Sequence, residues 1–325
     1  MLGRPRTIAP MAAVSIDLAT LVAPLDVDEF RRSHWPDAAY WSKGDDDRAA
    51  LLRTIPELAS AEAALAHAIG VRVFRPDRKM SLAPTGDAAL PLYRLGLTCY
   101  LDTKHIPAVR AAADRLAADL GMPAGTIDGE VFCSTGPSGA WMHSDFDVNF
   151  AVLLTGRKRW RIAPNEHIRN QMGMCAPSSI EAPDPSQLLL ADRTPFPDRM
   201  PDDAIEIEVG PGGVVFLPRG WWHETESDGE CMQVNFVLKN PTWISVLTGA
   251  IKTILVRDPE WRAFAYGIYG APDQQAAARQ RLGELLAGLP DHLGELLDPA
   301  DKDALAERLI ADCGWRPAGE VDTAP

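Results

Sequence analysis

Short apolar runs alternate with glycine and proline turns between residues 127 and 238. Residues 204–209 alternate apolar and charged side chains, as a half-buried strand does. A Gly-Pro-Gly-Gly turn follows at 210–213. Further strands are predicted at 129–133, 148–154, 158–162, 214–217, 222–225 and 231–238, with 148–154 and 158–162 joined as a hairpin through Gly156. Many short strands joined by such turns predict a barrel or a jelly roll.

Helical patterns flank this β-rich stretch. A helix is predicted from Asp26 or Asp28 to His34, an alanine-rich one over 55–69, and one over 107–120 that has Pro107 in its first turn. Beyond Asn240 the pattern predicts helices over 243–256, 274–289 and 301–311. We therefore expect a mixed region over 1–90 that packs on the barrel, a jelly-roll core over 91–240 and a helical region over 241–325.

A proline-rich insertion, residues 164–201, interrupts the predicted core. It contains seven prolines and few periodic apolar positions. Loops of this length inside a compact domain are usually functional or mobile. We expect it to border a substrate entrance, and a plain surface insertion is the alternative.

Candidate chemistry lies in His143, Asp145 and His223. Residues i and i+2 of a strand point to one face, so His143 and Asp145 are expected to face one cavity while Ser144 points away. Two histidines and one carboxylate are the donor set of a facial iron(II) site. The same set suits zinc, and a zinc hydrolase would need a general base, for which Asp147 or Glu224 are candidates.

Two segments carry a specific resemblance. Residues 143–160 read HSDFDVNFAVLLTGRKRW and residues 211–223 read PGGVVFLPRGWWH. Together with Val234-Asn235-Phe236 they resemble the JmjC and cupin-like 2-oxoglutarate oxygenases. The resemblance implies a double-stranded β-helix in which His143, Asp145 and His223 are the catalytic iron ligands.

The resemblance also implies residues that bind the cosubstrate. Lys158, fifteen residues after His143, would bind the far carboxylate of 2-oxoglutarate, although a lysine taken alone is usually solvated. Asn149 and Asn235 match asparagines near the cosubstrate, and Asn149 could equally be a structural amide. Several relatives carry a threonine three residues before the first histidine, where this chain has Ala140. The hydroxyls that are candidates to replace it belong to Tyr93, Thr98, Tyr100 and Ser134.

The implied activity is Fe(II)- and 2-oxoglutarate-dependent hydroxylation of a protein or peptide side chain or of a small molecule. One alternative is a cupin-fold protein that binds a metal or ligand without turnover, and the other is the zinc hydrolase. Lys158 discriminates among them, because a protein that only binds metal needs no clamp for a dicarboxylate.

Charge and cysteine usage narrow the partners. A net charge of −13 argues against a general nucleic-acid binder. Five cysteines lack paired spacing, which is typical of a reduced cytoplasmic protein. No signal peptide and no run long enough for a membrane helix is apparent. The C-terminal helices are expected to pack on the barrel or to form a homodimer.

Overall fold

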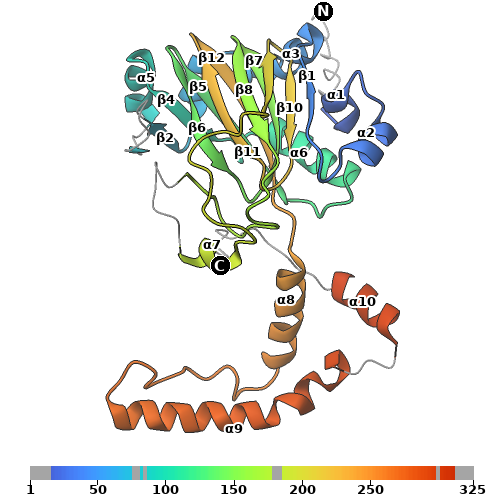
Figure 1. The fold of residues 1–325 in the computed structure, drawn as a ribbon, viewed down its shortest axis with the longest axis vertical. Helices are drawn as coiled ribbons and strands as arrows, with labels where there is room; N and C mark the ends of the chain where they lie inside the picture. The colour runs from blue at the N-terminus through green and yellow to red at the C-terminus, as the bar shows by residue number, and fades with distance from the viewer. Residues whose placement is uncertain (1–15, 75–80, 83–85, 178–184, 298–300, 312–325) are drawn as a thin grey trace, which may run out of the picture. The chain divides into compact units, whose positions relative to one another are not determined.

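The computed structural model describes residues 16–74, 81–82, 86–177, 185–297 and 301–311. The chain divides into two units, Met1–Lys239 and Asn240–Pro325. Figure 1 shows that the first unit contains the β-structure and that the second is helical. The two units are described separately.

Two antiparallel sheets form the first unit. The larger sheet contains β1 (Tyr40–Ser42), β10 (Val214–Leu217), β7 (Val148–Thr155), β12 (Cys231–Leu238), β5 (Ile127–Ser134), β4 (Thr98–Asp102), β2 (Val71–Phe74) and β3 (Ser81–Leu82), in that order. The smaller sheet contains β6 (Ser138–Ser144), β11 (Trp222–Ser227), β8 (Lys158–Ala163) and β9 (Ile205–Val209). The predicted jelly roll is confirmed.

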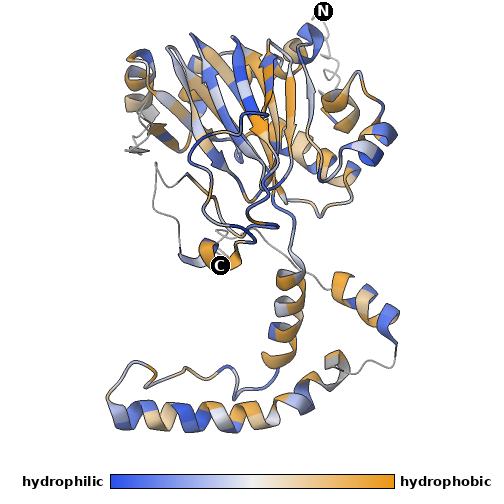
Figure 2. Cartoon of the chain, viewed as in Figure 1, coloured by the Kyte–Doolittle hydropathy of each residue, from blue (hydrophilic) through white to orange (hydrophobic). Residues whose placement is uncertain are grey.

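The two sheets pack face to face through one apolar cluster. Ala151, Leu153 and Val215 of the larger sheet meet Trp160 and Ile162 of the smaller one. Alternate residues of the larger sheet point the other way, into the main core. Figure 2 shows the resulting mixture of hydrophobic and hydrophilic positions along the strands. The inner face of the larger sheet is the face toward the smaller sheet. Side chains on this face can therefore line a site between the two sheets.

Helices cover the outer face of the larger sheet. They are α1 (Leu18–Val22), α2 (Val27–Ser33), α3 (Asp46–Arg53), the 3-10 turn η1 (Pro56–Leu58), α4 (Ala61–His67), α5 (Gly86–Arg94) and α6 (Pro107–Asp119). Asp26 caps α2 by accepting hydrogen bonds from the Asp28 and Glu29 amides. The helix predicted over 55–69 is divided, because the Ser60 hydroxyl accepts from the Ala63 amide and starts a new helix there.

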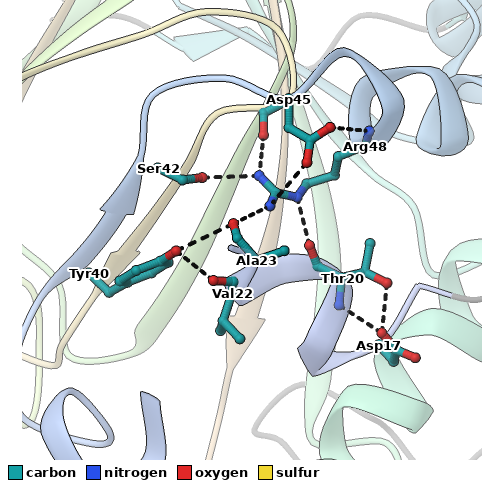
Figure 3. Close-up of polar contacts among 9 residues, drawn as sticks. Asp17, Thr20, Val22, Ala23, Tyr40, Ser42, Asp45 and Arg48 are labelled. Carbon is teal, nitrogen blue, oxygen red and sulfur yellow. Dashed lines mark hydrogen bonds and ion pairs between the residues drawn. The ribbon is translucent and has the colours of Figure 1, made fainter. Parts of the chain in front are cut away.

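Arg48 ties the N-terminal helices to the core (Figure 3). Its side chain is buried and donates hydrogen bonds to the Thr20 carbonyl at 2.7 Å, the Ala23 carbonyl at 2.6 Å and the Ser42 hydroxyl at 3.0 Å. It also donates to the Gly212 carbonyl in the turn before β10. One guanidinium thus links α1, β1 and the turn that leads toward His223.

The predicted hairpin of residues 148–162 is wrong. β7 lies in the larger sheet between β10 and β12, whereas β8 lies in the smaller sheet between β11 and β9. Gly156 adopts a φ of 85° at the connection, a conformation that glycine reaches without strain. The chain therefore crosses from one sheet to the other, which carries Lys158 to the wall opposite β7.

The described part of the insertion is packed, unlike the loop that its sequence suggested. Ile168, Cys175, Phe196 and Met200 form a small core with Met142, Ala163 and Trp222 on the outer face of the smaller sheet. A short helix, α7 (Pro185–Leu190), lies within it. The insertion thus supports the strands that carry His143 and His223 from behind.

The second unit contains α8 (Trp243–Leu255), α9 (Pro272–Leu297) and α10 (Lys302–Ala311). α9 is longer than predicted and contains Pro290. Among the described residues of this unit, Leu293 alone is a buried hydrophobic side chain. None of the helices in the described ranges is long and apolar enough to cross a membrane.

Candidate metal centre and cosubstrate pocket

Three side chains that could bind one metal ion meet between β6 and β11. His143 of β6 and His223 of β11 are direct partners across the strand pair, with ring centroids 4.1 Å apart. Asp145 Oδ1 lies 3.7 Å from His143 Nε2, and Asp145 Oδ2 lies 3.5 Å from His223 Nε2. One donor atom from each residue lies within 4.8 Å of the others. This is a facial arrangement of two nitrogens and one oxygen.

Backbone carbonyls orient both imidazoles. His143 Nδ1 lies 2.8 Å from the Trp141 carbonyl oxygen, and His223 Nδ1 lies 3.1 Å from the Trp221 carbonyl oxygen. Each Nδ1–H donates to its carbonyl, so each Nε2 keeps a lone pair directed at the centre of the triad. Burial, aided by the nearby His143, lowers the pKa of His223 to about 4. His223 is therefore neutral at pH 7, the state that a metal ligand requires.

The loop that carries Asp145 is held from two sides. β6 ends at Ser144, so Asp145 lies just beyond the strand on which it was expected. Ser144 points away from the triad, as expected, and its hydroxyl donates to Gln171 Oε1 at 2.9 Å. Ser144 also pairs with Cys175 through two backbone hydrogen bonds, and the Gly220 amide donates to the Asp145 carbonyl at 2.8 Å. Residues of the insertion therefore fix the loop that carries Asp145.

Lys158 lies at the other end of the same interior. It lines a small cavity of about 30 Å³ together with Thr98, Phe132, Cys133, Ser134, Ser138, Gly139 and Cys231. Its Nζ lies 5.2 Å from the centroid of the Trp160 ring, and that ring lies 6.2 Å from the His223 ring. Trp160 therefore spans the distance between the lysine and the triad.

The structure separates the four candidate hydroxyls. Thr98 and Ser134 line the cavity of Lys158. Tyr100 faces the same interior, but its hydroxyl donates to Glu130 Oε1 at 2.7 Å. Tyr93 is buried in the main core on the other side of the larger sheet, away from Lys158. Its position on α5 follows from packing that the local sequence does not reveal.

Both asparagines lie on the inner face of the larger sheet. Asn149 of β7 is 8% exposed and lies between Leu217 and Val237 of the neighbouring strands. Asn235 of β12 is the register partner of Glu130, and its Oδ1 accepts a hydrogen bond from Gln233 Nε2 at 2.6 Å. The amides thus face the space between the two sheets.

Sequence reasoning missed three further hydroxyls. Thr225 is buried opposite Ala140, whose amide donates to Thr225 Oγ1 at 2.9 Å. Ser138 Oγ lies 2.7 Å from Ser134 Oγ and 2.6 Å from Ser227 Oγ, so the three serines bridge the two sheets beside Lys158. Counting in steps of two from His223 would have found Thr225 and Ser227.

The residues present suit iron(II) and a dicarboxylate. Imidazole and carboxylate donors match a non-haem iron site with open positions. A lysine beside several hydroxyls matches a carboxylate, because a charge-assisted hydrogen bond is stronger than a neutral one. Trp160 Nε1 is buried without a hydrogen-bond partner among the described residues. A buried donor of this kind is an expected feature of a pocket for a polar ligand.

Comparison with known proteins gives consistent matches. Residues 98–240 match the family model of the cupin-like domain. The protein YxbC of Bacillus subtilis (strain 168) is 27% identical over 262 residues, which cover 76% of this chain and 78% of YxbC. The human 2-oxoglutarate and iron-dependent oxygenase JMJD4 is 28% identical over 117 residues, which cover 34% of this chain and 27% of JMJD4.

Solved structures of YcfD, a ribosomal oxygenase from Escherichia coli, are also similar. The one in complex with cobalt and 2-oxoglutarate has a TM-score of 0.44 at 20% identity, covering 83% of this chain and 69% of that chain. The complex with cobalt and succinic acid has a TM-score of 0.44 at 16% identity, covering 84% and 69%.

Proposed function

We propose that this chain, whose residues 98–240 match the cupin-like domain, is an Fe(II)- and 2-oxoglutarate-dependent oxygenase of the JmjC type. It would hydroxylate a C–H bond of a protein or peptide side chain or of a small molecule. One observation carries the proposal: the facial triad and Lys158 lie at opposite ends of one interior, with Trp160 between them.

Each residue has a defined part in this activity. Nε2 of His143, Nε2 of His223 and the Asp145 carboxylate would hold iron(II). Lys158 would pair with the far carboxylate of 2-oxoglutarate, assisted by the hydroxyls of Thr98, Ser134 and Ser138. Trp160 and the apolar cluster behind it exclude water from the interior. When bound, iron, 2-oxoglutarate and oxygen supply the oxidising power and release succinate and carbon dioxide.

The zinc hydrolase is less well supported. Of its two candidate bases, Glu224 accepts a hydrogen bond from Arg161 Nη1 at 2.8 Å and lies on the strand face opposite to His223. Asp147 follows the triad loop, but a hydrolase does not account for Lys158 and its cluster of hydroxyls. The same cluster argues against a protein that only binds metal.

Turnover of 2-oxoglutarate tests the proposal. The purified protein with iron(II), ascorbate and 2-oxoglutarate should release succinate, and His143→Ala and Asp145→Ala should lose both iron binding and succinate release. His67→Ala is the matched control, because His67 is an exposed histidine on α4, outside the site. Full turnover in either triad variant would overturn the ligand assignment. No turnover in the wild type, with zinc bound tightly, would favour a hydrolase.

We propose that the apolar surface beside the Asp145 loop forms an entrance that would fit a peptide or a small molecule with an apolar part. Phe146, Met172 and Met174 are 45–49% exposed, and they flank the loop of Asp145. Arg219 joins this rim to the loop before His223, because it donates to the Gln171 carbonyl and its Nη2 lies 3.6 Å from Met172 Sδ. Incubation with cell extract and detection of mass gains of one oxygen would identify the substrate.

We also propose that the second unit forms a homodimer. α8 exposes Trp243, Ile244 and Leu247 by 79%, 63% and 50%, and its ribbon is largely hydrophobic in Figure 2. A helix that is apolar on most faces needs a covering partner. Light scattering should give a dimer for the wild type and a monomer for Leu247→Glu. A monomeric wild type would contradict this.

The scattered cysteines support a cytoplasmic location.

A further inference from the structure

Asp145 is the triad residue whose side chain is least held by its surroundings. The Nδ1–H groups of His143 and His223 each donate to a backbone carbonyl. Within the ranges that the structure describes, no hydrogen bond reaches the Asp145 carboxylate, whose polar contacts are the Nε2 atoms of the two histidines at 3.7 Å and 3.5 Å. A carboxylate that ligates a metal is normally fixed by an outer hydrogen bond. The direction of Asp145 therefore depends on the backbone that carries it.

That backbone lies at the end of an edge strand. β6 is the first strand of the smaller sheet and pairs with β11 on one side. Strand ends with few backbone hydrogen bonds open more readily than the centre of a sheet. The other side of β6 is met by the proline-rich insertion, because Ser144 exchanges two backbone hydrogen bonds with Cys175. The insertion thus completes the strand end from which Asp145 follows.

Gln171 of the insertion holds the residue that lies between His143 and Asp145. Its side chain is completely buried. Gln171 Nε2 donates to the Ser144 carbonyl at 2.8 Å, and Gln171 Oε1 accepts a hydrogen bond from the Ser144 hydroxyl at 2.9 Å. The Ser144 carbonyl belongs to the planar peptide that leads into Asp145. Fixing this oxygen therefore fixes the plane from which the Asp145 side chain projects.

The same glutamine also contacts the loop that leads to His223. Its main-chain carbonyl accepts hydrogen bonds from Arg219, with Nε at 3.2 Å and Nη2 at 2.5 Å. The next residue, Gly220, donates from its amide to the Asp145 carbonyl at 2.8 Å. Gly220 has a φ of 83°, and a Cβ there would lie 3.7 Å from Gln171 Oε1. One residue thus joins the two loops whose separation sets the distance between Asp145 and His223.

An amide is an unusual choice for this position. Elsewhere the insertion packs on the smaller sheet through apolar side chains, among them Ile168, Phe196 and Trp222. Burying an amide costs free energy unless it forms hydrogen bonds. Packing alone would be met by an apolar side chain, whereas bonds to both the carbonyl and the hydroxyl of Ser144 require the two ends of an amide.

We propose that Gln171 is a positioning residue for Asp145. By holding the peptide between Ser144 and Asp145, it keeps the carboxylate within reach of a metal ion bound by the two histidines. The inference rests on the proposed function, since it concerns the triad that would hold iron(II). It gives the first part of the insertion a role in metal binding, separate from the proposed substrate entrance.

Cobalt(II) binding to the metal-free protein tests this role without turnover. Affinity and the visible absorption spectrum of bound cobalt are measured for wild type, Gln171→Met, Ser144→Ala, the double variant and, as the reference for a lost ligand, Asp145→Ala. Gln187→Met is the matched control. Gln187 is a buried glutamine of the same insertion, and its Oε1 accepts from Cys175 Sγ at 3.7 Å instead of bonding to the Asp145 loop. Thermal unfolding of each metal-free variant and succinate release at saturating iron are recorded in parallel.

We expect Gln171→Met to weaken cobalt binding about 10–100-fold, the loss typical of removing an outer partner of a metal ligand. Its spectrum should shift toward that of Asp145→Ala, because the carboxylate leaves the ion. Ser144→Ala should weaken binding less, since the bond to the Ser144 carbonyl remains. The double variant should bind as Gln171→Met does, because the serine hydroxyl has then already lost its partner. Gln187→Met should keep the wild-type affinity and spectrum even where its Tm falls.

Wild-type affinity and spectrum in Gln171→Met would overturn the inference, and so would an equal loss in Gln187→Met. If Gln171→Met does not fold, Ser144→Ala decides, and unchanged cobalt binding in that variant would overturn the inference. A wild type that binds no cobalt would overturn both the inference and the metal site. A wild type that binds cobalt but releases no succinate with iron would refute the oxygenase function alone, and weaker cobalt binding in Gln171→Met would still support the positioning of Asp145.

Discussion

Replacing Glu130 by glutamine should stabilise the metal-free protein at alkaline pH and leave it unchanged in acid. The pKa of Glu130 rises from 4.5 in the unfolded chain to about 7 in the folded protein, chiefly because of burial. Between these values the folded protein keeps a proton that the unfolded chain has released. Stability contributed by this group is therefore present below pH 4.5 and lost as the pH rises through 7. Glutamine never ionises, and its side-chain oxygen can still accept the hydrogen bond from Tyr100.

The size of the effect follows from the difference between the two pKa values. At about 1.4 kcal/mol per pH unit, ionised Glu130 costs the folded state about 3 kcal/mol at pH 8. For a unit of this size, a gain of that amount corresponds to a rise in Tm of about 6–12 °C. Asp147, whose pKa burial raises to about 6, adds a similar slope, but it is present in both proteins and cancels.

Thermal and urea unfolding of EDTA-treated wild type and Glu130→Gln, from pH 4.5 to 8, would measure this. The free energy of unfolding of Glu130→Gln should exceed that of the wild type by an amount that increases from pH 5 to pH 8. Glu208→Gln, on the exposed face, should show no such increase. Added zinc should reduce the advantage of glutamine, because a nearby cation favours the ionised carboxylate. A difference that does not change with pH, or a less stable Glu130→Gln at pH 8, would refute the reasoning.

Three further outcomes are expected. Lys158→Ala should raise the KM for 2-oxoglutarate about a hundredfold or more with iron binding unchanged, because breaking one side of a buried ion pair costs about 3–5 kcal/mol; an unchanged KM would place the clamp elsewhere. Replacing residues 176–192 by a Gly/Ser linker leaves Ile168, Cys175, Phe196 and Met200 of the small core in place. Iron and 2-oxoglutarate binding should therefore persist, while hydroxylation of the true substrate should fall sharply. Hydroxylation at the wild-type rate would show that the segment is only a surface insertion. Arg48→Met should lower the free energy of unfolding by about 3 kcal/mol or more, because it leaves the carbonyls of Thr20, Ala23 and Gly212 without their donor. A urea midpoint equal to that of the wild type would show that Arg48 does not stabilise the fold.

Local periodicity and local chemistry could be predicted from the sequence. The strands around His143, Lys158 and His223 repeat every second residue, so their directions, and the outward direction of Ser144, follow from the chain itself. The cap at Asp26 and the start of α6 at Pro107 depend on neighbours within one helical turn. The i, i+2 spacing selected His143 and Asp145, and the resemblance of the second motif added His223; the structure brings donor atoms of all three within reach of one metal ion.

Contacts between distant parts of the chain decided the rest. The assignment of β8 to the smaller sheet depends on pairing with β11 and β9, which lie more than 40 residues away. Closing such long loops costs conformational entropy, and this cost is offset by contacts between the distant strands, which the local sequence pattern does not reveal. The same holds for Thr225 opposite Ala140 and for the small core under the insertion.

Electrostatic roles were equally beyond the local sequence. Nothing around Glu130 in the chain distinguishes it from the acid two residues earlier, yet Asp128 is paired with Lys104, Arg110 and Lys239, whereas Glu130 accepts a hydrogen bond from Tyr100. A carboxylate takes its pKa from burial and from the charges that folding brings near it. The sequence therefore determined which groups can ligate, cap or alternate, and the tertiary structure decided which of them meet and in what charge state, because burial and charge proximity exist only once distant segments pack together.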